Sequence, residues 1–100
     1  MAKEDKTQEE KRPTNAIYIG QKPLMSYALA ALLLFNAGHD EVIVKARGRT
    51  ISKAVDVAEI IRRRLFADSV NINEVKIGTE VLGEEMRNVS TIEIVLGRKE

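Results

Sequence analysis

The stretch Lys45-Ala46-Arg47-Gly48-Arg49-Thr50-Ile51-Ser52-Lys53 holds four cations and no anion, and it lies where a predicted strand gives way to a helix. Its first three cations alternate, so an extended chain would project them to one side. Gly48 can adopt an unusual backbone dihedral, and Thr50 is expected at the N-cap of the helix. Because helix N–H groups and the helix dipole favour anions, the stretch predicts a phosphate-binding loop.

The composition limits the classes of protein that this chain can belong to. Its 100 residues, 44% of them apolar, suffice for one small domain with a limited core. The absence of cysteine excludes disulfides, thiolate nucleophiles and cysteine-based zinc sites. The longest apolar run, residues 27–35, is too short to span a bilayer, and the N-terminus is charged. We therefore expect a cytoplasmic protein with no membrane contact.

Apolar periodicity predicts the order βαβαββ, with elements at residues 16–19, 23–37, 41–46, 50–66, 70–82 and 89–96. The first strand is apolar throughout, as is typical of a central parallel strand buried on both faces. The first helix is apolar nearly all round, so we expect both the sheet and another surface, such as a second subunit, to cover it. The fifth element slips in phase near Asn73-Glu74, which indicates a β-bulge. Residues 1–13 are predicted to be a disordered polar tail, and residues 14–99 the domain.

The basic residues are concentrated in the middle of the chain. Net charge is only +1, yet residues 21–65 carry eight cations against four anions. Turns at residues 20–23 and 47–50 each follow a predicted parallel strand, so both should lie at one edge of the sheet. We expect this to bring Lys22 close to Arg47 and Arg49 in a composite positive patch.

Three motifs resemble those of the Alba family of archaeal chromatin proteins. They are Ile19-Gly20-Gln21-Lys22-Pro23-Leu24-Met25-Ser26-Tyr27, Lys45-Ala46-Arg47-Gly48-Arg49-Thr50-Ile51-Ser52-Lys53-Ala54-Val55-Asp56 and Val89-Ser90-Thr91-Ile92-Glu93-Ile94. The resemblance implies a dimeric α+β domain with a mixed sheet and two helices, similar to the C-terminal domain of bacterial translation initiation factor three. It also implies sequence-independent binding of double-stranded DNA, and of RNA, in a nucleoid-associated protein that compacts the chromosome. The partner subunit would be a second copy or a paralogue.

The resemblance and the charge pattern together predict the residues of the interface. The expected nucleic-acid contacts are Gln21, Lys22, Lys45, Arg47, Gly48, Arg49, Lys53 and Arg87. Gln21 stands where the family has an acetylation-sensitive lysine, and the hairpin tip carries Glu84 and Glu85 beside Arg87. The resemblance also implies that Leu65 and Phe66 join dimers side by side on DNA. Lys22, Arg47, Arg49 and Lys53 in both subunits of a dimer would make on the order of eight phosphate contacts. The logarithm of the binding constant should then fall against log salt with a slope of roughly −7.

Other functions have weaker support in the sequence. Asp56 and Glu59 lie among arginines, so we expect ion pairs rather than a catalytic pair, and no enzyme, metal or cofactor is predicted. Tyr18 and Tyr27 lie in apolar stretches, which favours core packing over base stacking. An RNA-binding subunit of a ribonucleoprotein and a protein scaffold built on Leu65 and Phe66 remain as alternatives.

Overall fold

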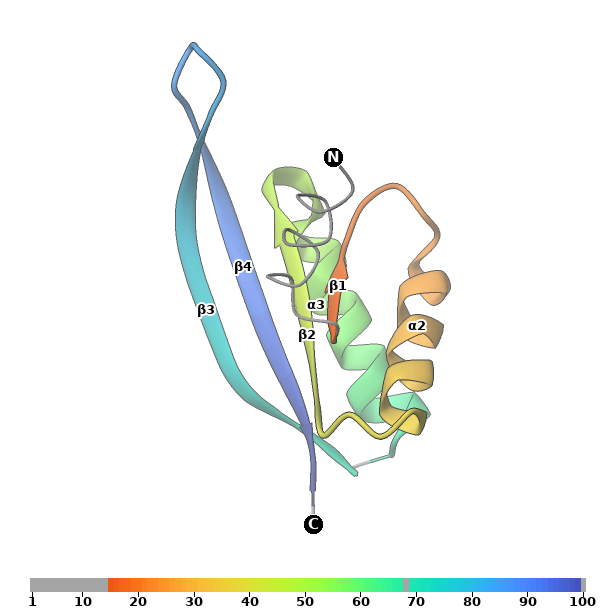
Figure 1. The fold of residues 1–100 in the computed structure, drawn as a ribbon. Coiled ribbons are helices and arrows are strands. Elements are labelled where there is room, and N and C mark those ends of the chain that lie inside the picture. Colours follow the sequence, from red (N-terminus) through yellow and green to blue (C-terminus); the bar gives the residue numbers. More distant parts are fainter. Residues whose placement is uncertain (1–14, 68, 100) are drawn as a thin grey trace, which may run out of the picture.

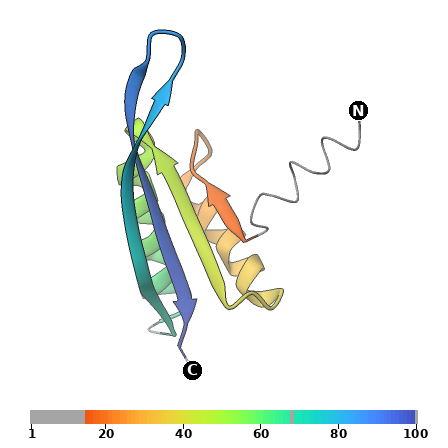
Figure 2. The ribbon, with the colours of Figure 1, turned by 60° about the vertical axis from the view of Figure 1, so that its left-hand side comes forward.

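The computed structural model describes residues 15–67 and 69–99, which form two layers. One layer is a sheet of β1 (Ala16–Tyr18), β2 (Glu41–Arg47), β3 (Val70–Leu82) and β4 (Arg87–Arg98). The other consists of helices α2 (Leu24–Asn36) and α3 (Ile51–Ile60), which cover the same face of the sheet (Figure 1, Figure 2). The predicted order βαβαββ and the predicted fold class are confirmed. The predicted tail, residues 1–13, lies outside the described residues.

The strand order across the sheet is β1-β2-β4-β3, with β1 parallel to β2 and the other pairs antiparallel. The prediction that the first strand is central was wrong, because β1 forms an edge. Ile17 is buried, but Tyr18 is 50% exposed on the face that the helices leave open, so the predicted core packing of Tyr18 was also wrong. A short apolar run looks the same in an edge strand and a central strand, because its lateral neighbours come from distant segments of the chain.

The core lies between the sheet and the helices. Alternate residues of β2 and β4 point into it, because successive side chains of a strand face opposite sides. Small residues on the helices, such as Ala28, Ala31 and Ala54, allow the layers to approach closely. The residues that fill this core and are fully buried include Phe35, Val42, Val44, Val57, Ile61 and Leu96.

Helix α2 is apolar nearly all round, as expected, but the described chain covers only one side of it. Leu29 and Leu33 remain 49% and 67% exposed. The second predicted helix, at residues 50–66, is divided in the structure: α3 ends at Ile60 and Ile61–Leu65 form a π-helical turn. No helix in the described ranges is long and apolar enough to cross a membrane.

Strands β3 and β4 form a long hairpin that extends beyond the body of the domain (Figure 1). The predicted bulge is confirmed, because the register of β3 against β4 shifts between Ile72 and Glu74. The tip is shorter than the predicted residues 83–88, since Leu82 already pairs with Arg87. Arg87 therefore begins β4 at the far end of the hairpin.

Candidate nucleic-acid interface

Lys53 joins the two turns that the sequence places at one edge of the sheet. Its ammonium group donates hydrogen bonds to the carbonyl oxygens of Gly20 at 3.1 Å and Lys22 at 2.7 Å. Lys53 lies in the first turn of α3, whereas Gly20 and Lys22 belong to the turn between β1 and α2. Lys53 therefore ties the N-terminal turn of α3, which directly follows the second predicted turn, to the first predicted turn.

Tyr27 holds the turn between β1 and α2 in place from the core side. Its hydroxyl oxygen accepts hydrogen bonds from the backbone N–H groups of Gly20 at 2.8 Å and Lys22 at 3.0 Å. The ring is buried, and the Lys53 ammonium lies 5.7 Å from its centroid. Core packing of Tyr27 is confirmed, but its second role as an acceptor for the loop has no signal in a single sequence. These two backbone N–H groups are therefore bound to Tyr27 within the protein.

The second turn is built around Gly48. Its φ of +59° lies in the left-handed region that glycine tolerates, so the expected unusual dihedral is confirmed. Gly48–Thr50 form a 3₁₀ turn between β2 and α3. The Thr50 hydroxyl donates to the Arg47 carbonyl oxygen at 2.8 Å and accepts from the Arg47 N–H at 3.3 Å. These bonds hold the turn closed on itself.

One prediction about this stretch is confirmed and one is corrected. Thr50 is the N-cap residue of α3, as expected, although its side chain bonds Arg47 and makes no capping hydrogen bond to the helix. Arg49 lies in the 3₁₀ turn and not on the strand, so the three cations do not form one extended row. Only Lys45 and Arg47 share a face of β2. Arg49 extends the positive surface toward the α3 end of the turn.

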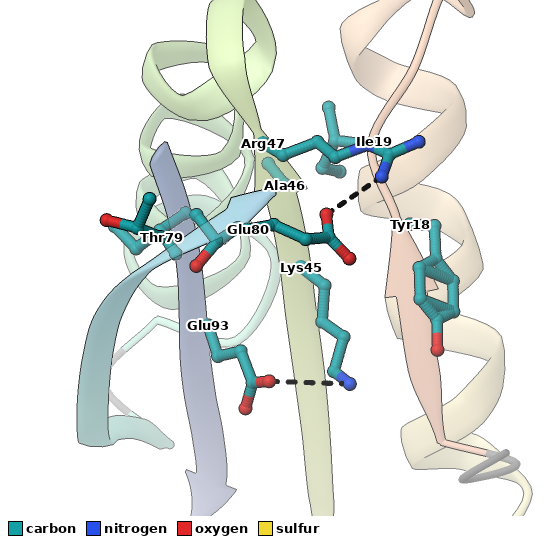
Figure 3. A pocket seen from close by; sticks show the side chains of 10 residues that line it. Tyr18, Ile19, Lys45, Ala46, Arg47, Thr79, Glu80 and Glu93 are labelled. Atoms are coloured by element: carbon teal, nitrogen blue, oxygen red, sulfur yellow. Dashed lines mark hydrogen bonds and ion pairs between the residues drawn. The ribbon is translucent and has the colours of Figure 1, made fainter. Parts of the chain in front are cut away.

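Two of the predicted contacts face carboxylates across the sheet (Figure 3). Lys45 Nζ lies 3.4 Å from Glu93 Oε2, and Arg47 Nη1 lies 2.8 Å from Glu80 Oε1. These four side chains, with Tyr18, line a hollow of about 730 Å³ on the helix-free face. In the described part of the chain, Lys22 and Arg49 have no ion-pair partner. The interface thus contains both paired and unpaired cations.

Glu59 lies at the opposite end of α3 and forms ion pairs with two arginines. Its Oε1 atom is 3.0 Å from Arg62 and 2.7 Å from Arg63, as the helical spacing predicts. Burial raises the pKa of Glu59, but hydrogen bonds from the two arginines and their charges outweigh it, so the pKa lies below its ordinary value. Among residues 15–67 and 69–99, no cluster of His, Asp or Glu could hold a metal ion.

Gln21, Arg87, Leu65 and Phe66 are the remaining residues that the sequence predicts to make contacts. Arg87 is exposed at the far end of the hairpin. Gln21 is exposed beside Lys22 in the first turn. Leu65 and Phe66, predicted to join dimers, are partly buried against the core, and the Phe66 ring packs edge-on against Phe35 at 5.0 Å. Their contact with a neighbouring dimer stays a prediction.

Comparison with known proteins identifies relatives of this arrangement. The protein-family model described as Alba matches residues 15–79. "DNA/RNA-binding protein Alba 1" of Archaeoglobus fulgidus is 52% identical over 87 residues, which cover 85% of this chain and 97% of that protein. The structure of Alba from Thermoplasma volcanium matches 84% of this chain and 100% of its own, with 50% identity and a TM-score of 0.78. ALBA1 from Trypanosoma brucei matches with a TM-score of 0.77 at 26% identity, over 90% of this chain and 74% of its own.

Proposed function

The chain belongs to the Alba family, and we propose that it binds double-stranded DNA through the phosphate backbone, without reading base sequence, and so packages chromosomal DNA. The observation that carries this proposal is the pair of exposed cations Lys22 and Arg49, which have no ion-pair partner among the described residues, on two turns at either side of the Lys53 hydrogen bonds. Flexible cations on a rigid turn suit phosphate oxygens, which repeat along every duplex regardless of sequence.

RNA is the second candidate ligand. The printed name of the Archaeoglobus relative includes both DNA and RNA, and phosphate contacts do not distinguish them. We therefore propose that structured RNA binds the same turns, as it would in a ribonucleoprotein subunit.

We include a homodimer in the proposal, because β3 exposes apolar side chains on one face. Ile72, Val75, Ile77 and Val81 are 38%, 53%, 82% and 52% exposed, although they point to the side of the sheet that carries the helices. Ile77 and Ile51 of α3 line one shallow hollow there. β3 is also an edge strand, and exposed apolar edges tend to associate. A second copy of the chain that covers this stripe would double the number of cations facing one duplex.

The test is a charge removal at the unpaired cations. We expect Arg49→Ala to weaken binding between about tenfold and hundredfold at roughly 0.1 M salt, because a dimer loses two phosphate contacts. The loss should be equal on AT-rich and GC-rich duplexes, measured by fluorescence anisotropy. Arg64→Ala removes the same charge beyond the other end of α3 and should leave affinity nearly unchanged. A loss confined to one duplex sequence would show base recognition instead.

A further inference from the structure

The helix-free face of the sheet carries a row of charges that the two turns do not explain. Lys45 and Arg47 project from β2 on this face. The residues that alternate with them, Val44 and Ala46, are buried on the opposite face, under the helices. The strand register places Glu93 opposite Lys45 and Thr91 opposite Arg47. The residue that pairs with Arg47 on the neighbouring strand β4 is therefore uncharged.

Arg47 reaches its carboxylate partner by crossing that neighbouring strand. Glu80 belongs to β3, which is separated from β2 by β4, yet the guanidinium nitrogen and the carboxylate oxygen are 2.8 Å apart. Thr91 and Gly78 face each other across β4 and β3 in this row. Both are small, so the long arginine side chain can lie over them. Figure 3 shows the Arg47 and Glu80 side chains pointing toward each other.

The Arg47–Glu80 pair is open to exchange. The two side chains are 56% and 49% exposed, and pairs in such positions contribute little to stability. The Lys45–Glu93 pair is less accessible, with Lys45 only 27% exposed. Carboxylate and phosphate oxygens accept the same hydrogen bonds from a guanidinium group. A phosphate could therefore replace the Glu80 carboxylate at Arg47 without any change in the backbone.

We propose that Arg47 forms a phosphate site which the Glu80 carboxylate occupies in the free protein, so that Glu80 lowers nucleic-acid affinity by competing for it. This inference rests on the proposed function and names the residue that limits it. Arg47 then contributes almost no net charge to binding, in contrast to Lys22 and Arg49, which have no competing anion in the described ranges.

The test compares the wild-type protein with Glu80→Gln, which removes the charge but keeps the shape of the side chain. We expect Glu80→Gln to bind a mixed-sequence duplex about tenfold more tightly at roughly 0.1 M salt. The slope of log K against log salt should become steeper by about 2 for a dimer, because two further phosphates are neutralised. Glu74→Gln is the matched control, since it removes the same charge from the same face of the same strand, near Lys76 instead of Arg47. It should change neither quantity.

A double-mutant cycle assigns the effect to Arg47. In an Arg47→Ala background, Glu80→Gln should gain little affinity, because the site it vacates no longer exists. An equal gain with and without Arg47 would show general charge repulsion and would overturn the inference. If the wild-type protein binds the duplex with a steep salt dependence and Glu80→Gln matches it, only this inference fails. If the wild-type protein does not bind at low salt, the proposed function itself fails.

Discussion

Lys53 has two tasks that a sequence cannot separate. Its charge lies in the basic stretch and predicts a phosphate contact. Its ammonium group also donates to two carbonyl oxygens, 33 and 31 residues earlier in the chain. The positions of the cations were predictable from spacing and charge, because those are local properties. The groups that these residues contact were not predictable, because they come from distant segments of the chain. Lys53 bonds the Gly20 carbonyl, the Lys22 N–H bonds Tyr27, and Arg47 pairs with Glu80.

The fastening role of Lys53 predicts a loss of stability. We expect Lys53→Met to lower the free energy of unfolding by about 1–2 kcal/mol, because two charge-assisted hydrogen bonds are lost while the apolar stem is kept. Urea denaturation measures this. Lys22→Met is the matched control, since the Lys22 ammonium makes none of the described hydrogen bonds and its removal should leave stability unchanged. Equal stability of the Lys53 variant and the wild-type protein would leave Lys53 with a phosphate contact as its only role.

At the scale of elements, predictions succeeded where they depended on local periodicity. The alternation of β2, the bulge of β3 and the two helices follow from patterns within each segment. The edge position of β1 and the 3₁₀ turn at Gly48–Thr50 did not, because they depend on pairing between strands and on side-chain bonds to the backbone. The turn places Arg49 off the strand, whereas Arg47 remains on β2 and pairs with Glu80.

The ion pairs of Glu59 near the C-terminal end of α3 should make the free energy of unfolding depend on pH. The pKa of Glu59 is lower in the folded chain, so its pairs with Arg62 and Arg63 stabilise the fold above the ordinary glutamate pKa of about 4.3. That contribution is lost as the pH falls through the lowered pKa. Glu59→Gln should therefore reduce the free energy of unfolding at pH 7 by about 0.5–1 kcal/mol for the two pairs, and by nearly nothing at pH 2.

Urea denaturation at the two pH values measures the Glu59 effect. Asp56→Asn on the same helix serves as the control, because Asp56 makes no ion pair among the described residues. An equal loss of stability at pH 7 and pH 2 after Glu59→Gln would contradict an ionic origin and indicate a packing effect instead.

At the scale of the whole molecule, the chain leaves apolar surface on two elements. The stripe on β3 and the stripe on α2 are both exposed, and composition does not distinguish them. We propose that a dimer contact would lie on β3, because β3 is an edge strand and its exposed apolar residues adjoin α3. Ile77 is 82% exposed, so Ile77→Glu should leave the fold of the protomer unchanged. The substitution should prevent dimerisation, because it would bury a charge in the contact.

Sedimentation equilibrium measures the outcome of Ile77→Glu. We expect a monomer whose salt slope for duplex binding is about half that of the wild-type protein, because half the phosphates are neutralised. Leu33→Glu changes an exposed leucine on α2, 67% exposed, and should remain dimeric. A dimeric Ile77 variant together with a monomeric Leu33 variant would transfer the contact to α2.

The most direct test of phosphate binding without sequence reading is the salt dependence of wild-type affinity on two duplexes of unrelated sequence. Lys22, Arg49 and Lys53 in two protomers give about six net contacts once Glu80 offsets Arg47. We therefore predict that log K falls against log salt with a slope of roughly −5 on both duplexes. A slope near zero, or a slope and affinity that differ strongly between the duplexes, would contradict the account.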